Sequence, residues 1–495
     1  LSDAPLREAC RIAFGTEALP RYDIASARLL ISFGDDFLES GASPVQLLRG
    51  FASMSAADEH GSKGRFIYVG SRLSLTGLNA DEWVPIKPGS EAALALGMAS
   101  VIAAVGSAAA GPYASLLSAY DARSAAEAAG ISEDTVRELA ERFISEGPSL
   151  AMGPGVGAHH RNATAAHLAV LILNHVAGNV GRTLHLDGGP AGATRPYADM
   201  EGAIQAMAGG QVGVAMFHGA NPAYTLPNAS GFLEALGGVA FKVSFASAPD
   251  ETSALADLVL PDRHFLESWG DSAPRAGLMA LRQPVMQAVP HFDAKQTGDV
   301  LLSVGSRLGH ALGGATFYEV LRGAHLTMHG GEAATFEAAW REALRKGVAE
   351  HPVEPTAAAA ELRAPDTALT FDAPALDGDG DFALMVYPSS RFGAGEFSNS
   401  PWMQELPDPV SKIVWHSWVE LNPAAAEARG LRKGEIVTVA SPHGSVDLPV
   451  WLYPGIREDV VAVAMGGGHT DFGRWGTGKG ANAMALLPAV AEQPS

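Results

Sequence analysis

Cysteine is almost absent from this sequence: among 495 residues there is one, Cys10. An iron–sulfur cluster normally takes four thiolate ligands, a structural zinc site usually takes two to four, and a disulfide takes two. This stretch therefore forms none of these by itself. Within the segment APLREACRIAFG we interpret Cys10 as a small apolar residue on a helix, with a metal-ligand or redox role as the open alternative.

Basic residues and long apolar runs are also scarce. Lys and Arg number 34 against 54 Asp and Glu, a formal net charge of −20, which argues against nucleic acid as a partner. The most apolar stretch, residues 91–111, is rich in Ala and Gly and falls short of the roughly 18 apolar residues that cross a bilayer, so we predict a buried helix there. The chain opens at Leu1 without a basic-then-apolar leader, so we expect a processed or incompletely represented product.

Several catalytic and nucleotide-binding signatures are missing from the sequence. Gly153, Gly155 and Gly157 follow an expected strand, but the third glycine comes too early for the GxGxxG dinucleotide fingerprint. That turn is either a plain tight turn or a backbone contact to a nucleotide-like ligand. His159 and His160 are adjacent and diverge on a regular element, and neither HExxH nor GxSxG occurs, so we predict no histidine metal site.

The composition that is present indicates a folded protein of two to four structural units. Hydrophobic residues make up 47% of the chain, with 56 Gly and 31 Pro, as in compact proteins with many turns. ARLLISFGDDF and GRFIYVG have the form of short strands, and PVQLLRGFASMSA between them has helical spacing, which predicts parallel strands joined by a helix. Residues 350–381 are rich in Pro, Ala and Asp without periodicity and are predicted to be a linker, and IVTVASPHGSVDLPVWLY beyond it predicts a hairpin of a β-barrel.

Small polar groups and glycines follow four of the expected strands. These strand ends are residues 32–36, 70–72, 219–221 and 247–251. In open parallel sheets the ligand crevice lies beyond the carboxyl ends of the strands, so these ends indicate a binding crevice, with ordinary polar loops as the alternative. Among the acidic residues, Glu267 and Asp271 in HFLESWGD stand out as carboxylates in a tight turn that need hydrogen bonds.

The segment AMGGGHTDFGRWGTGKG is unusually rich in glycine. Glycines let backbone amides approach a phosphate or a pterin ring closely, and Arg474 and Lys479 could balance an anionic ligand. A loop that simply covers a barrel is the alternative interpretation.

Six segments in this order resemble the molybdopterin oxidoreductase superfamily, and together they cover nearly the whole chain. The likeness is greatest to the branch that holds the molybdopterin-oxidoreductase-like part of the large iron–sulfur subunit of alternative complex III and related quinone reductase complexes. The segments are DEWVPIKPGSEAALALGMASVI, LILNHVAGNVGR, HGANPAYTLP, DETSALADLVLPDRHFLESWGD, NSPWMQELPDPVSKIVWHSWVELNP and GLRKGEIVTVASPHG.

This resemblance implies a fold of two interleaved α/β (Rossmann-like) domains and a C-terminal double-psi β-barrel. The first α/β domain would be discontinuous, made of residues 1–90 and 205–349, with residues 91–204 inserted as the second. Residues 350–381 would link them to the barrel at residues 382–495.

The resemblance also implies a function. We expect part of a membrane-associated, quinol-oxidising electron-transfer complex of the alternative complex III type, structural and without a molybdenum cofactor of its own. Its partners would be iron–sulfur, cytochrome c and integral membrane quinol-binding subunits at the periplasmic face, and iron–sulfur clusters would lie in other segments or in those subunits. The alternative is a catalytic molybdenum enzyme with a bis-pterin guanine dinucleotide. The residues that would line that cofactor's cleft are Gly34, Asp35, Ser71, Arg72, Gly89, Asn221, Glu251, Gly468 and His469.

Overall fold

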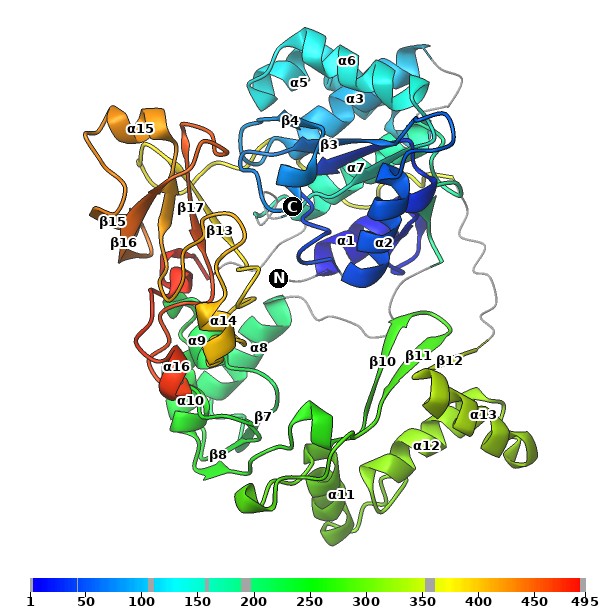
Figure 1. The fold of residues 1–495 in the computed structure, drawn as a ribbon, viewed down its shortest axis with the longest axis vertical. Helices are drawn as coiled ribbons and strands as arrows, with labels where there is room; N and C mark the ends of the chain where they lie inside the picture. Colours follow the sequence, from blue (N-terminus) through cyan, green and yellow to red (C-terminus); the bar gives the residue numbers. More distant parts are fainter. Residues whose placement is uncertain are drawn as a thin grey trace.

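The fold is mixed α/β, with sheets of both parallel and antiparallel strands (Figure 1). The structure is a computed structural model that describes residues 3–41, 43–105, 111–155, 160–187, 197–351 and 361–489. Gly157 and His159, singled out above, and residues 352–360 of the expected linker lie outside the described residues.

The first unit (residues 3–187) is built on four parallel strands and the helices that cover them. Its strands are β1 (Arg21–Tyr22), β2 (Leu29–Phe33), β3 (Arg65–Val69), β4 (Glu82–Val84), β5 (Ser149–Met152) and β6 (Leu184–His185), and its α-helices are α1 (Ala4–Phe14), α2 (Pro44–Ser55), α3 (Glu91–Val105), α4 (Ala114–Ala119), α5 (Ala122–Ala129), α6 (Glu133–Ser145) and α7 (Ala163–Val176). The main sheet has the order β4–β3–β2–β5. Strand β2 is buried along its whole length, as expected for a parallel sheet with helices on both faces.

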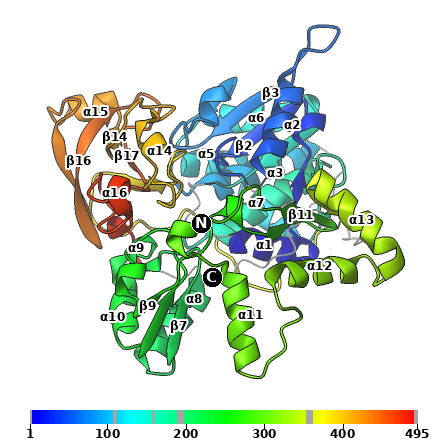
Figure 2. The same cartoon turned by 60° about the horizontal axis from the view of Figure 1, so that its bottom comes forward.

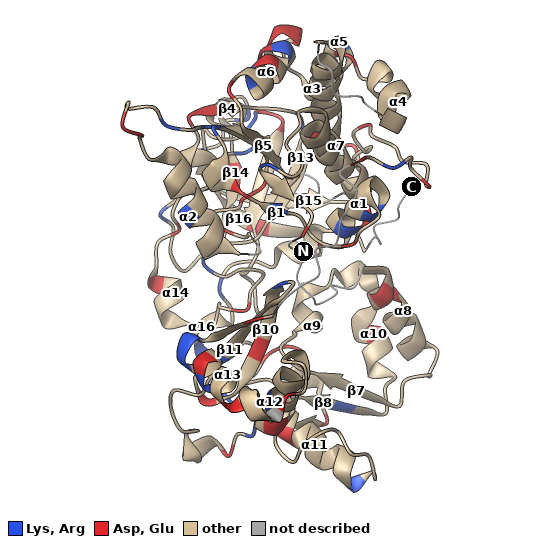
Figure 3. Ribbon diagram, turned by 90° about the vertical axis from the view of Figure 1, so that its right-hand side faces the viewer, with Lys and Arg blue, Asp and Glu red and all other residues tan. Residues whose placement is uncertain are grey.

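Helices α3 and α7 form the centre of this unit. Both are apolar around most of their circumference, and most of their residues are buried, which explains why the most hydrophobic run of the sequence is a core helix. In Figure 3 these two helices are almost free of charged residues, whereas α6 at the surface carries both signs. Cys10 lies on α1 and is fully buried in the same core, so its interpretation as a small apolar helix residue is confirmed; burial raises the pKa of its thiol to about 12.

Strand pairing divides the chain differently from the domains implied by the resemblance. Strand β5 belongs to the expected insert, residues 91–204, yet it pairs in parallel with β2 of the expected first domain. The three strands between residues 214 and 259 form a sheet of their own. The physical reason is that β5 covers an edge of β2 whose backbone N–H and C=O groups would otherwise lack partners.

The end of the expected linker packs tightly on the first unit. Leu362 and Phe371 are buried in the core of that unit, and the Arg363 N–H donates to the Ala13 carbonyl over 2.8 Å. Residues 361–372 are therefore part of the first unit's surface layer rather than a free connection.

The second unit (residues 197–268) holds three parallel strands in the order β7–β8–β9. Its elements are α8 (Tyr197–Ala208), β7 (Val214–Phe217), α9 (Pro222–Thr225), α10 (Phe232–Gly237), β8 (Phe241–Ser244) and β9 (Leu258–Val259). An arm follows, at the lower right of Figure 1, with β10 (Gly270–Arg275), β11 (Leu278–Arg282), α11 (Thr297–Arg307), α12 (Phe317–Met328), α13 (Ala333–Lys346) and β12 (Val348–Glu350). Its three strands are antiparallel.

The C-terminal unit (residues 382–489) contains a mixed sheet of five strands in the order β13–β17–β14–β16–β15. Its elements are β13 (Ala383–Tyr387), α14 (Pro401–Glu405), β14 (Val419–Leu421), α15 (Pro423–Glu427), β15 (Ile436–Ser441), β16 (Gly444–Leu452), β17 (Val460–Ala464) and α16 (Gly473–Gly476). The predicted hairpin is confirmed: β15 and β16 are antiparallel, and Ser441 faces Gly444 across the turn. Figures 1 and 2 show this unit, in orange and red, beside both the first and the second unit.

Within the part of the chain that the structure describes, we find no helix that combines the length and the apolar character needed to cross a membrane.

Candidate functional site

Two crevices lie where the C-terminal unit covers the carboxyl ends of the parallel strands. One is at the ends of β7 and β8 in the second unit, and the other is at the ends of β2 and β3 in the first unit. The carboxyl edge of an open parallel sheet is where ligands of α/β proteins bind. Both crevices are therefore candidate sites, and they differ greatly in size.

The second-unit crevice is a cavity of about 640 Å³. Its floor is formed by the segments that follow the two strands, and its roof comes from the C-terminal unit. The described lining residues include His218, Gly219, Ala220, Asn221, Ser247, Asp250, Asp262, Arg263, Gly395, Glu396, Asn399, Ser400 and His469. The volume lies within the range of about 300–1,000 Å³ that is typical of small-molecule sites.

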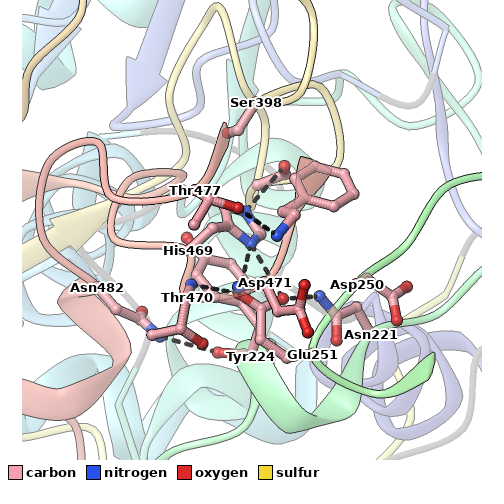
Figure 4. A network of polar contacts seen from close by, with 12 residues as sticks. Asn221, Tyr224, Asp250, Glu251, Ser398, His469, Thr470, Asp471, Thr477 and Asn482 are labelled. Carbon is pink, nitrogen blue, oxygen red and sulfur yellow. Dashed lines mark hydrogen bonds and ion pairs between the residues drawn. The ribbon is translucent and has the colours of Figure 1, made fainter. Parts of the chain in front are cut away.

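Asn221, Glu251 and His469, three of the predicted site residues, meet at one wall of this cavity (Figure 4). The Asn221 amide donates to Glu251 Oε2 over 2.6 Å, and His469 Nδ1 lies 3.1 Å from Glu251 Oε1. The backbone N–H groups of Thr470 and Asp471 also donate to Glu251 Oε1, over 2.7 and 3.2 Å. This carboxylate therefore ties the second unit to the glycine-rich C-terminal loop.

Glu251 is the carboxylate at the centre of this network. Burial opposes ionisation of Glu251, but the hydrogen bonds from His469 and Asn221 outweigh it and lower the pKa of the carboxyl to about 2. The second ring nitrogen of His469, Nε2, lies 3.2 Å from the Gly395 carbonyl. Both ring nitrogens of His469 thus lie against oxygen atoms of the protein.

Aromatic stacking holds the His469 ring in place. Tyr224 lies parallel to it with ring centroids 3.6 Å apart, and Phe472 lies on it with centroids 4.5 Å apart. The Tyr224 hydroxyl donates to the Gly467 carbonyl over 2.7 Å. A side chain at Gly395, which has φ +128°, would collide with the Tyr224 ring, so this position requires glycine.

Gly468 adjoins this network, as predicted. It has φ +78°, and its N–H donates to the Lys479 carbonyl over 2.6 Å. The Arg474 guanidinium lies over the Trp475 ring, and the Lys479 ammonium lies near the Trp415 ring. Neither basic side chain lines the described cavities, so the prediction that they face an anionic ligand is not supported by their positions.

The first-unit crevice gathers Gly34, Ser71 and Arg72, together with Asp36. Its cavity is only about 10 Å³, the size of one water molecule. Arg72 is buried and forms a two-pronged ion pair with Glu420 of the C-terminal unit, and its Nη2 donates to Glu420 Oε1 over 2.9 Å. The predicted residues at this edge are thus in contact with protein rather than around an open space.

Three other residues considered in the sequence lie away from both cavities. Gly89, with φ +79°, faces Ala373 and Pro374 at the end of the expected linker. Glu267 accepts a hydrogen bond from the Val289 N–H over 3.2 Å, and Asp271 lies in β10 of the arm. A fourth residue, Asp35, follows Gly34 at the edge of the first-unit crevice but does not line its cavity. Burial raises the pKa of its carboxyl to about 6.

Sequence reasoning missed Tyr224, Tyr387 and Glu420. Tyr387 and Glu420 hydrogen bond to each other over 2.7 Å beside Arg72, and Tyr224 stacks on His469. A usable signal was the charged residue inside the apolar strand segment WVEL, because a buried carboxylate needs a partner.

Two protein-family models match this chain. Residues 9–304 match the family described as molybdopterin oxidoreductase, and residues 402–493 match the molydopterin dinucleotide binding domain. The second match covers most of the C-terminal unit that roofs both crevices.

Individual proteins with similar sequences or structures carry names that are consistent with these two family models. The menaquinone reductase, molybdopterin-binding-like subunit, of Nitratidesulfovibrio vulgaris is 30% identical over 510 residues, covering 97% of this chain and 70% of that protein. The arsenate respiratory reductase molybdopterin-containing subunit of Shewanella sp. is 31% identical over 98 residues, 19% of this chain and 12% of that protein. Acetylene hydratase from Pelobacter acetylenicus has a similar structure, with a TM-score of 0.74 and 16% identity over 97% of this chain and 77% of that one, a likeness of fold.

These matches correct one expectation from the sequence. We expected that this chain carries no cofactor of its own, and that expectation is wrong, because the two family models point to a molybdenum bis-pterin cofactor. The expectation rested on the resemblance to the alternative complex III branch and on the scarcity of redox ligands. A single cysteine excludes a cluster held by this stretch alone but says nothing about pterin contacts, which backbone and polar side chains can make.

Proposed function

Because the chain belongs to the molybdopterin oxidoreductase family, we propose that it is the molybdopterin-binding part of an oxidoreductase complex linked to a quinone pool. The observation that carries this proposal is the match to the menaquinone reductase subunit along 97% of the chain. A molybdenum–pterin cofactor, when bound, supplies two-electron oxidation or reduction of a small substrate. The chain's own residues would bind and orient it.

The second-unit cavity fits a pterin dinucleotide. Gly219 has φ +60° and no atom within 4 Å of the position of a side chain, so a ligand can approach its backbone closely. Asp250 and Asp262 supply carboxylates that suit the N–H donors of a guanine base, while Arg263 brings positive charge to the same lining. The Glu251–His469 network would support this wall from behind.

We further propose that the C-terminal unit is a double-psi β-barrel. Its mixed sheet, in which β14 is parallel to β16 and antiparallel to β17, supports this assignment, as does the dinucleotide-binding match over residues 402–493. In that arrangement the unit closes both strand-end crevices from one side.

We also propose that the complex is respiratory, of the alternative complex III type or a related quinone reductase, and lies at the periplasmic face of the membrane. Its other subunits would carry iron–sulfur clusters, cytochrome c and a membrane quinone site. The relation to a menaquinone reductase subunit supports a quinone partner. If the chain purifies from native membranes without any co-migrating subunit, this placement is wrong.

The experiment that tests the function is metal and pterin analysis of the purified protein. We expect molybdenum together with a fluorescent oxidised pterin, in constant ratio to the chain. Protein from cells grown on tungstate is the control, in which tungsten should replace molybdenum in the same ratio. Absence of both metals and of pterin from freshly purified complex would refute the proposed function.

A further inference from the structure

The glycine-rich loop of the C-terminal unit, residues 466–480, forms part of the roof of the second-unit cavity. His469 and Phe472 of this loop line the cavity, together with a second roof segment between Gly395 and Ser400. The floor of the cavity belongs to the second unit. The shape of the cavity therefore depends on what holds the glycine-rich loop over that unit.

Two residues of the second unit, Tyr224 and Glu251, hold the roof. Among the described residues, every hydrogen bond or ion pair between the second unit and the C-terminal unit involves one of these two. The Tyr224 hydroxyl donates to the Gly467 carbonyl over 2.7 Å, and the Asn482 amide donates to the Tyr224 carbonyl over 3.1 Å. The remaining polar contacts between the two units are made by Glu251.

Glu251 holds the glycine-rich loop through both of its carboxylate oxygens (Figure 4). His469 Nδ1 lies 3.1 Å from Oε1 and 3.2 Å from Oε2, and the N–H groups of Thr470 and Asp471 donate to Oε1 over 2.7 and 3.2 Å. The contact is largely shielded from water, because the side chains of Glu251 and His469 are 10% and 2% exposed. One carboxylate thus fastens three consecutive residues of the loop.

Glu251 does not itself line the cavity, although its neighbours Asp250 and Asn221 do. A ligand in the cavity would therefore contact residues on either side of Glu251 rather than its carboxylate. Any effect of Glu251 on a ligand passes through the loop that it holds.

Asn221 fixes the direction in which the Glu251 carboxylate points. Asn221 Oδ1 accepts hydrogen bonds from the Thr252 N–H over 3.1 Å and from the Thr252 hydroxyl over 2.7 Å, so its Nδ2 faces Glu251 Oε2, 2.6 Å away. The Asn221 amide cannot turn round without losing both bonds from Thr252. Position 251 therefore needs an acceptor toward Asn221 and another toward the loop, and a carboxylate supplies both.

His469 transmits the position of Glu251 to the rest of the roof. Its Nε2 lies 3.2 Å from the Gly395 carbonyl, which belongs to the second roof segment, and its ring lies against the Phe472 ring. The loop is also closed on itself, because the Gly478 N–H donates to the His469 carbonyl and the Phe472 N–H donates to the Thr477 hydroxyl. A shift of His469 would therefore move both cavity-lining side chains of the loop.

We propose that Glu251 is a positioning residue for the second-unit cavity: it holds His469 and Phe472 in the roof without touching the ligand. This inference rests on the proposed function only for the identity of the ligand, a pterin dinucleotide. A ligand that contacts His469 or Phe472 binds the closed loop better than the open loop, so opening of the loop and loss of the ligand are linked.

The first test is hydrogen exchange at the Thr470 and Asp471 amides of the purified complex. Glu251→Gln keeps the size of the side chain but sets an NH2 group against either Asn221 Nδ2 or the loop N–H groups, which are all donors. Because hydrogen bonds to a charged group are strong, we expect exchange at the two loop amides to become about tenfold faster or more.

Two controls show whether the change is confined to the loop. Glu234→Gln makes the same chemical change at an exposed residue of the second unit that does not line the cavity, and it should leave exchange unchanged. The amide of Ile31, buried in β2, is the internal reference and should exchange equally in all variants. Equal exchange at Thr470 and Asp471 in wild type and Glu251→Gln would overturn the inference.

A double variant tests whether Glu251 acts by hydrogen bonding or only by filling space. In Asn221→Asp/Glu251→Gln the new amide NH2 at position 251 donates to the new carboxylate at position 221, and its oxygen accepts from Thr470 and Asp471. The carboxylate at position 221 still accepts from Thr252. We expect slow exchange to return in the double variant but not in Asn221→Asp alone, which brings two carboxylates together. A double variant that exchanges as fast as Glu251→Gln would contradict positioning by hydrogen bonds.

Retention of the ligand tests the link between the roof and the cavity. GMP and oxidised pterin, released by acid and hydrolysis, are counted per chain at intervals after dilution of the purified complex. We expect Glu251→Gln to lose them about tenfold faster than wild type and Glu234→Gln to lose them at the wild-type rate. Equal retention together with faster loop exchange would overturn the link. Absence of pterin from the wild type would refute the proposed function, and the exchange comparison would still decide whether Glu251 holds the roof.

Discussion

Removing one partner of the Arg72–Glu420 ion pair should cost far more stability than removing an exposed charge. Arg72→Met leaves the Glu420 carboxylate, which is 1% exposed, without its cation. Breaking one side of a buried pair typically costs about 3–5 kcal/mol. Glu420 keeps the hydrogen bonds from Tyr387 and Trp418, so we expect a loss at the lower end, about 3 kcal/mol.

The double variant distinguishes an ion pair from two independent contributions. In Arg72→Met/Glu420→Gln neither charge remains, so the loss should be smaller than the sum of the single losses, with a coupling energy of about 2 kcal/mol or more. Arg123→Met is the control, because Arg123 and its partner Glu127 are 75% and 70% exposed and the expected loss is below about 1 kcal/mol.

Urea unfolding of the full chain, followed by tryptophan fluorescence, measures these free energies, since Trp418 lies in the cluster itself. Native-state hydrogen exchange at the Leu73 amide measures the same loss locally. A loss of about 3 kcal/mol corresponds to a roughly 150-fold larger equilibrium constant for local opening. Single losses below about 1 kcal/mol that simply add in the double variant would show that the pair is solvated, and the argument for a closed crevice would then fail.

Three other parts of the molecule give predictions of their own. Burial raises the pKa of Glu91 from its ordinary 4.5 to about 7, so the cost of ionising it in the folded protein is absent below pH 4.5 and grows up to about pH 7. Glu91→Gln should therefore stabilise the chain by at most about 3 kcal/mol at pH 8 and not at pH 4. Thermal melts measure this difference, with the exposed Glu141→Gln as control. Gly395→Ala should lower stability by about 1–3 kcal/mol in urea unfolding, because the new methyl group would collide with the Tyr224 ring; equal stability would contradict the packing described. Met216, in β7, is 55% exposed, and exposed apolar side chains favour association between molecules. Met216→Lys should therefore reduce self-association, measured by light scattering, without lowering the melting temperature. Unchanged self-association would show that Met216 does not drive association.

Much of the first unit and of the strand-end chemistry was predictable from local pattern. The strand that stops at Gly34, the helix that follows, and the hairpin around Pro442 and His443 all depend on neighbouring residues, because burial of short apolar runs and turn chemistry act over a few positions. Likewise the polar ends of β7 and β8, with Asn221, were recognisable from the residues alone as candidates for a crevice.

The sequence by itself determined which segments form strands, which end in glycine or polar groups, and that one cysteine cannot hold a cluster. Only the tertiary structure decided that β5 joins β2, that Glu251 meets His469 from 218 positions away, and that Arg72 meets Glu420 from 348 positions away. The physical reason is that strand and turn preferences arise between close neighbours, whereas the space left at a sheet edge depends on how distant segments pack. Two crevices with similar sequence signals therefore differ, one open and one filled by an ion pair.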